Sequence, residues 1–114
     1  MELKHHHAHC SPAETYKAYK RFFTTLASDS RLRILNLLRE EPMHVTAIVE
    51  SLGRDQPSVS HDLARLRECG FVTAHRSGRV IEYRINEDTI TPILELIDTH
   101  MDAHCIHIVR SLGS

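Results

Sequence analysis

The chain lacks tryptophan and has only three cysteines, four glycines and four prolines in 114 residues. The cysteines, Cys10, Cys69 and Cys105, are few and odd in number, which argues against a disulfide scaffold and favours a reducing compartment. No apolar run approaches the length of a membrane span, and the first residues lack the apolar segment of a secretory signal. We therefore expect a cytoplasmic protein with no membrane contact.

Net charge is also nearly absent. A formal charge of −1 excludes a generic polycation that coats nucleic acid, but not DNA binding by a local basic patch. The hydrophobic content of 41% is too high for intrinsic disorder, and the length suits one core. No linker rich in proline or glycine interrupts the chain. We expect residues 1–11 to form a flexible His/Cys-rich arm and residues 12–114 to form a single domain.

Histidine, in contrast, is abundant, with ten copies. Imidazole titrates near neutral pH and is a common metal ligand, so the composition indicates metal or proton chemistry. Charge is unevenly placed. Residues 54–84 carry six arginines against four acids, whereas residues 86–114 carry five acids against one arginine. The middle of the chain is therefore the better place to bind a polyanion, and the C-terminal end suits cations.

Up to residue 70, apolar residues recur at helical spacing and predict four helices. The first begins at Pro12 with Ser11 as its N-cap, and Asp29 or Ser30 caps the second. The third and fourth span residues 46–52 and 57–68, and glycines follow both.

Residues 71–85 then alternate between apolar and polar side chains around a Ser77-Gly78 tip, which predicts a β-hairpin. A last long helix begins near Thr91-Pro92 and runs to Leu112. The order α-α-α-α-β-β-α is mainly helical with a small β-hairpin, and it predicts a winged helix-turn-helix fold.

A recognition helix carries small polar side chains in its first turn, because that end points into the major groove. The fourth helix fits this pattern, and the tip of the hairpin is basic. The candidate DNA-binding residues are Gln56, Ser58, Ser60 and His61 for base edges or phosphates, Arg65 for a phosphate, and Arg76 and Arg79 for the minor groove or phosphates. Alternatively, the serines cap a surface helix and the arginines are solvated, but the joint pattern favours DNA binding.

One such unit makes few contacts, so useful affinity for double-stranded DNA requires a symmetric dimer on a palindromic operator. We expect the last helix to supply the dimer interface through a coiled-coil-like seam of Leu94, Ile97, Met101, His104 and Ile108. The first helix, rich in tyrosine and phenylalanine, would cover that seam. Alternatively, the last helix folds back on its own core.

Three stretches resemble the ArsR/SmtB family of winged-helix repressors, and the resemblance covers about residues 16–100. They are Leu26–Leu35, Gln56–Val72 and the wing from Gly78-Arg79 to Tyr83. The resemblance implies a homodimer that represses an operator and releases it when an effector binds.

Two His/Cys groups lie outside the predicted DNA-binding unit. In the last helix, His100, His104 and His107 share one face, with Cys105 near the apolar seam. The arm contributes His7, His9 and Cys10. The resemblance adds His44, which falls where the family's first thiolate ligand sits.

The family's two metal sites do not transfer intact. The segment Met43–Ala47 lacks cysteine, the segment Glu87–Thr89 lacks histidine, and Thr99 and Ala103 occupy positions where the family has a later histidine pair. We therefore hypothesise that His and Cys side chains bind a metal here too, but at positions shifted from those of the family. Alternatively, His44 is a capping or surface residue, the histidines of the last helix are a titrating edge of the dimer seam, and Cys69 is a small buried residue.

Mixed His/Cys ligands favour Zn(II), Ni(II) or Co(II) as the effector, with metal binding lowering operator affinity. A second hypothesis keeps the DNA-binding scaffold and uses Cys10 and Cys105 to sense thiol oxidation or polysulfide. A metal-dependent enzyme is disfavoured, because the sequence shows no partner general base, glycine-rich phosphate loop or nucleophile elbow.

Overall fold

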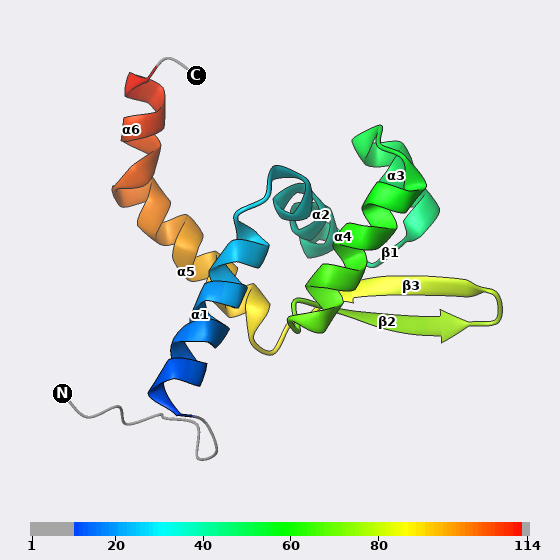
Figure 1. The fold of residues 1–114 in the computed structure, drawn as a ribbon. Coiled ribbons are helices and arrows are strands. Elements are labelled where there is room, and N and C mark those ends of the chain that lie inside the picture. The colour runs from blue at the N-terminus through cyan, green and yellow to red at the C-terminus, as the bar shows by residue number, and fades with distance from the viewer. Residues whose placement is uncertain (1–10, 113–114) are drawn as a thin grey trace.

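The computed structural model describes residues 11–112 and confirms the winged helix-turn-helix fold. Its elements are α1 (Pro12–Leu26), α2 (Asp29–Glu40), β1 (Met43–His44), α3 (Val45–Leu52), α4 (Gln56–Glu68), β2 (Val72–Ser77), β3 (Val80–Ile85), α5 (Ile90–Ala103) and α6 (Cys105–Ser111). The helix-turn-helix is α3–α4, and the wing is β2–β3. Figure 1 shows α1 and α5–α6 on one side of the molecule and the wing on the opposite side. The predicted arm, apart from Ser11, lies outside the described residues.

The ends of the first two helices follow from local hydrogen bonds. Ser11 caps α1 as predicted: its Oγ accepts from the backbone N–H of Glu14 at 3.2 Å, and the Glu14 carboxylate accepts from the Ser11 N–H at 3.1 Å. The predicted cap of the second helix was wrong. Ser28 is the N-cap, and its Oγ accepts from the N–H of Arg31, because Asp29 and Ser30 already lie inside the first turn.

The sheet has one strand more than predicted. The two-residue strand β1 pairs with β3, with Met43 opposite Tyr83 and His44 opposite Glu82, so the order is β1-β3-β2. A two-residue strand carries no alternation that a sequence pattern can show. Its pairing places His44 at the outer edge of the sheet.

The prediction of a single long last helix was also wrong. Helix α5 begins at Ile90 and ends at Ala103, because the φ of −129° and ψ of −59° of its C-cap, His104, leave the helical region before α6 begins. The apolar spacing continues across His104, so the sequence period carries no signal of this break. Within residues 11–112, no helix has the length and apolar character needed to cross a membrane.

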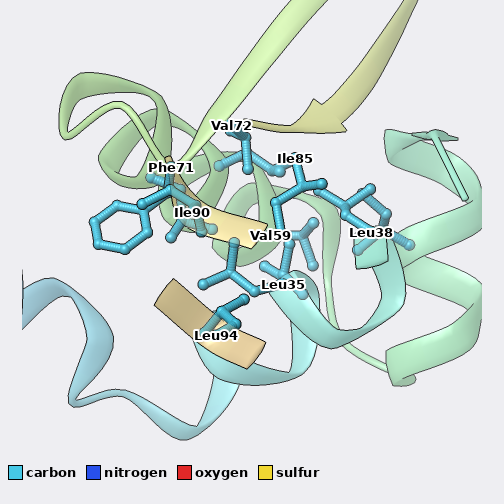
Figure 2. Close-up of a cluster of buried hydrophobic side chains, with 12 residues drawn as sticks. Leu35, Leu38, Val59, Phe71, Val72, Ile85, Ile90 and Leu94 are labelled. Atoms are coloured by element: carbon cyan, nitrogen blue, oxygen red, sulfur yellow. The ribbon is translucent and has the colours of Figure 1, made fainter. Parts of the chain in front are cut away.

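The core joins α2, α3, α4, the sheet and the start of α5, as Figure 2 shows. The apolar stripe predicted for α4 is confirmed, since Val59, Leu63 and Leu66 are all 0% exposed. Helix α1 reaches this core through Phe22, whose ring centroid lies 4.9 Å from that of Phe71. The buried stripe leaves the opposite side of α4 facing solvent.

A buried carboxylate fixes α4 against its neighbours. Asp62 is 6% exposed, and its Oδ2 accepts from Ser30 Oγ at 2.6 Å. Two guanidiniums complete the set, because Arg31 donates to Oδ1 and Arg54 donates to Oδ2, each at 3.3 Å. A buried charge is costly unless it is paired and hydrogen-bonded. The packing of α2, the α3–α4 turn and α4 therefore depends on keeping these four side chains together.

We predict that Asp62→Ala lowers the free energy of unfolding by about 3 kcal/mol, because it leaves two partly buried guanidiniums without their anion. Urea denaturation at a fixed chain concentration measures this. The control is Asp29→Ala, which removes an ion pair with Arg33 whose side chains are 84% and 66% exposed. That variant should lose less than about 1 kcal/mol. Equal losses in the two variants would contradict the role assigned to Asp62.

Candidate functional site

The first turn of α4 is built around Asp55, its N-cap. One Asp55 oxygen accepts from the Ser58 N–H at 2.9 Å, and the other accepts from the Ser58 hydroxyl at 2.8 Å. These bonds, the backbone one first, hold the pKa of the Asp55 carboxyl below its ordinary value. The hydroxyl proton of Ser58 is thus engaged within the protein, although the cap is Asp55 and not a serine as the capping alternative had it. Its contact with DNA stays a prediction.

The other polar residues of this turn face solvent. Gln56, Ser60 and His61 are exposed: Ser60 and His61 lie off the buried stripe of α4, and Gln56 begins the helix. Arg67 lies seven positions after Ser60 and so on the same side of the helix, and it is also exposed. A groove of about 440 Å³ between α4 and the wing is lined by Ser60, Leu63, Ala64, Arg67, Glu68 and Tyr83. Arg67 was not among the predicted site residues, although this spacing identifies it.

The arginines divide into two groups. Within residues 11–112, six form ion pairs with acidic side chains: Arg21, Arg31, Arg33, Arg39, Arg54 and Arg84. Arg67, Arg76, Arg79 and Arg110 are exposed and form no such pair among these residues. Arg76 lies near the end of β2 and Arg79 lies in the turn at the wing tip. Three of these four arginines lie on α4 and the wing, and the fourth, Arg110, lies on α6.

Arg65, predicted to contact a phosphate, has a partner inside the protein. Its side chain is half-buried, and its Nε donates to Thr25 Oγ1 at 2.9 Å. Cys69, one helical turn later, lies 3.3 Å from the same oxygen and is half-buried rather than buried. Burial raises the pKa of the Cys69 thiol, but hydrogen bonds with Thr25, Arg21 and Arg65 outweigh it and lower that pKa.

The predicted C-terminal metal ligands are only partly brought together. The rings of His100 and His104 lie 4.7 Å apart and are tilted by 33°, so these two share a face of α5. His107 lies in α6, beyond the break at His104, where the regular helical wheel no longer applies. Cys105 is half-buried at the start of α6. In the described part of the chain, no three His, Cys, Asp or Glu side chains are placed to hold one ion.

His44, the predicted fourth ligand of the arm site, is exposed on β1. It precedes α3 without capping it through its side chain, and its Nδ1 lies 3.3 Å from the Ile81 carbonyl oxygen. This contact leaves Nε2 without a partner among the described residues. The other predicted ligands of this site, His7, His9 and Cys10, lie outside the described residues, so the arm site stays a prediction.

Large apolar side chains are exposed on the side away from the wing. On α1 they are Tyr16, Tyr19 and Phe23, at 72%, 48% and 63% exposure. On α5 they are Leu96 at 71% and Met101 at 39%. Leu94 and Ile97, two predicted seam residues, instead pack on the chain's own core, as the alternative interpretation of this helix predicted. The side chain of Ile108 lies outside the described set.

Comparison with known proteins places this architecture in a family. The model for bacterial regulatory proteins of the arsR family matches residues 28–74. The HTH-type transcriptional regulator NmtR of Mycobacterium tuberculosis is 41% identical over 70 residues, which are 61% of this chain and 58% of NmtR. An uncharacterised HTH-type transcriptional regulator of Methanocaldococcus jannaschii is 35% identical over 86 residues, which are 75% of this chain and 97% of that protein.

A probable mercury resistance operon repressor of Streptomyces lividans is 33% identical over 76 residues, which are 67% of this chain and 61% of the repressor. The chain thus spans less than two thirds of NmtR and of this repressor. Among solved structures, a homodimeric winged helix-turn-helix DNA-binding domain from Mycobacterium bovis, described as a possible ArsR-family transcriptional regulator, is 30% identical. It superposes with a TM-score of 0.77 over 89% of this chain and 95% of that domain. The chain belongs to the ArsR family of bacterial regulatory proteins, a family of transcriptional regulators and not of enzymes.

Proposed function

We propose that this chain is a homodimeric repressor that binds a palindromic double-stranded DNA operator and releases it when Zn(II), Ni(II) or Co(II) binds. The observation that carries the proposal is the exposed side of α4. It presents Gln56, Ser60 and His61 beside a wing whose Arg76 and Arg79 have no ion pair among the described residues. The opposite side of α4 is anchored in the core, so the polar side has a fixed orientation.

In a major groove, these side chains match the chemistry of base edges. Gln56 can form paired hydrogen bonds with adenine, and Ser60 and His61 can bond to base edges or phosphates. Arg67 extends the same stripe towards the phosphate backbone. The wing arginines suit a narrow minor groove, where the negative potential is strongest. Ser58 contributes indirectly, because its bonds to Asp55 fix the end of the helix that enters the groove.

A second copy of the chain supports both affinity and symmetry. Helices α1 and α5, which carry exposed apolar residues, lie on the side of the molecule opposite the wing (Figure 1), so a dimer formed through them would leave both wings free at its outer ends. The similar domain from Mycobacterium bovis is homodimeric. A two-fold dimer matches a palindromic site, with two recognition helices entering successive major grooves.

For the effector, His100 and His104 provide two nitrogen ligands on one face of α5. A tetrahedral or octahedral site needs further ligands, which His107, Cys105 or the partner chain would supply. A second site would join His44 to His7, His9 and Cys10 of the arm. The Streptomyces lividans relative is named for mercury resistance. Here, however, two cysteines apart from Cys69 are too few for a three-thiolate site, so borderline metals fit better.

For base recognition, we predict that Ser60→Ala combined with His61→Ala weakens specific operator binding by at least about 10-fold while nonspecific affinity is unchanged. Fluorescence anisotropy with an operator duplex and a scrambled duplex measures both. Both side chains are exposed, so stability should be retained. Asn36→Ala, an exposed change on α2, is the control and should bind like the wild type. An unchanged operator affinity in the double variant would refute the role of α4.

For phosphate contacts, we predict that Arg76→Gln and Arg79→Gln each reduce the slope of log affinity against log salt by about 0.9, because each contact releases about one condensed counterion. The loss should be similar for specific and nonspecific duplexes. Lys17→Gln, at an exposed position on α1 away from the wing, should leave the slope unchanged. Equal slopes in wing variants and the wild type would exclude the wing from the interface.

For sensing, we predict that His100→Ala combined with His104→Ala abolishes the metal-induced loss of operator affinity for at least one of Zn(II), Ni(II) and Co(II). Metal-free operator binding should be unchanged. Anisotropy titrations with each ion, and with an oxidant or polysulfide, measure the response. The coupling lost should be about 1–3 kcal/mol. His44→Ala tests the arm site in the same way, and His75→Ala on the wing is the control.

A full metal response in the double variant would exclude the α5 site. If metals leave the wild-type affinity unchanged while oxidant or polysulfide abolishes it, the metal-responsive function is wrong and the thiol-sensing alternative with Cys10 and Cys105 replaces it.

A further inference from the structure

Thr25, in the last turn of α1, is a buried polar residue that the proposed DNA contacts do not use. It is 0% exposed, and its hydroxyl donates to the Arg21 carbonyl oxygen at 2.8 Å. The same Oγ1 accepts from Arg65 Nε at 2.9 Å and lies 3.3 Å from Cys69 Sγ. A single threonine oxygen on α1 therefore contacts two residues of the recognition helix.

The Thr25 backbone extends this connection. Its carbonyl oxygen accepts from Arg31 Nε at 2.7 Å, and Arg31 Nη2 donates to the Thr24 carbonyl oxygen at 3.3 Å. The remaining nitrogen of the same guanidinium, Nη1, donates to Asp62. We name the set Thr25, Arg31, Asp62, Arg65 and Cys69 the α1–α4 junction.

The junction contacts α4 at more than one point. Asp62, Arg65 and Cys69 follow one another at intervals of three and four residues, so they lie on one side of α4, over two helical turns. Two separated attachment points fix the direction of a helix, whereas one point fixes only its position. On α1 the second point is Arg21, one turn before Thr25, whose Nη2 donates to Glu68 of α4 at 3.0 Å. The hydrogen bonds are directional, unlike the apolar contact of Phe22 with Phe71 that also joins α1 to the core.

The two helices joined here have different proposed tasks. Helix α1 exposes apolar side chains on the proposed dimer side, and α4 carries the proposed base contacts. In a symmetric dimer, the recognition helices must lie about one DNA turn apart, roughly 34–36 Å. The angle between α1 and α4 therefore sets the half-site spacing that the dimer accepts.

We propose that Arg65 is a positioning residue and not a phosphate contact: through Thr25 it holds the recognition helix at a fixed angle to α1, and this sets the operator spacing that the dimer recognises. The inference rests on the proposed function of DNA binding by a dimer. It gives Arg65 a positioning role, and it gives Thr25 a role in operator recognition although Thr25 is fully buried.

The test uses Thr25→Val, Arg65→Met and the double variant in the full chain. The probe is a palindromic duplex selected by the wild-type protein from a random-sequence library, together with versions whose half-sites are one base pair closer or farther apart. The wild type should prefer the selected spacing by at least about 10-fold, since a spacing change misplaces one recognition helix. Each single variant should reduce this preference to within about 3-fold. The double variant should be no worse than either, because both changes break the same contact.

Salt dependence separates positioning from direct contact. Arg65→Met should leave the salt slope of binding unchanged, whereas Arg67→Met, an exposed arginine two residues later, should lower it by about 0.9 and keep the spacing preference. Thr25→Ser keeps the hydroxyl and should keep the preference. If Arg65→Met does not fold, Arg65→Lys replaces it, because lysine keeps the charge but loses the planar Nε donor.

Three outcomes overturn the inference while leaving DNA binding intact. They are a salt slope lowered by about 0.9 in Arg65→Met with spacing preference retained, a retained preference in Thr25→Val, and a retained preference in Arg65→Lys where that variant is used. If the wild-type protein selects no duplex at all, the proposed function fails and the inference fails with it.

Discussion

The carboxylate of Asp62 is the constraint to which the rest of the structure is fitted. It lies on the recognition helix, inside the protein, and it is stable there only while Ser30, Arg31 and Arg54 surround it. These partners come from α2 and from the turn before α4, so satisfying one charge fixes three parts of the chain. Apolar packing beneath α4 would tolerate small rotations, because it is non-directional. The hydrogen bonds to Asp62 are directional, so they limit the rotation of α4 that the buried stripe alone would allow.

Local patterns predicted most of the helices because their causes are local. The Ser11–Glu14 capping box and the Val59, Leu63 and Leu66 stripe depend on residues within one or two turns of each other. Features that depend on distant partners were missed. Strand β1 exists through its pairing with β3, and a charged residue in a helix, such as Asp62, ordinarily indicates a solvated face. Its partner Arg31 lies 31 positions earlier in the sequence.

The candidate site shows the same division. The exposure of Gln56, Ser60 and His61 was predictable, since none of them occupies a position of the apolar stripe. Arg65 and Arg67 look alike in sequence, but their environments differ, because only Arg65 faces a threonine 40 positions away. His100 and His104 were predictable as a pair, four residues apart. His107 was not, because α5 ends at Ala103, and further ligands from a second chain leave no pattern in one sequence.

The near-zero net charge now has a structural explanation compatible with DNA binding. Six arginines form ion pairs with five carboxylates within the described residues, and Arg67, Arg76 and Arg79, which form none there, lie at the proposed interface. A metal held by His100 and His104 would act on α5, on the side of the molecule away from the wing (Figure 1). Its effect on α4 would have to pass through the helices between them. Arg39 of α2 bonds Asp98 of α5 at 2.7 Å, and Arg31 of α2 bonds Asp62 of α4. Helix α2 thus contacts both ends of the route, and a displacement of α5 that moves α2 would disturb the carboxylate on which the orientation of α4 depends.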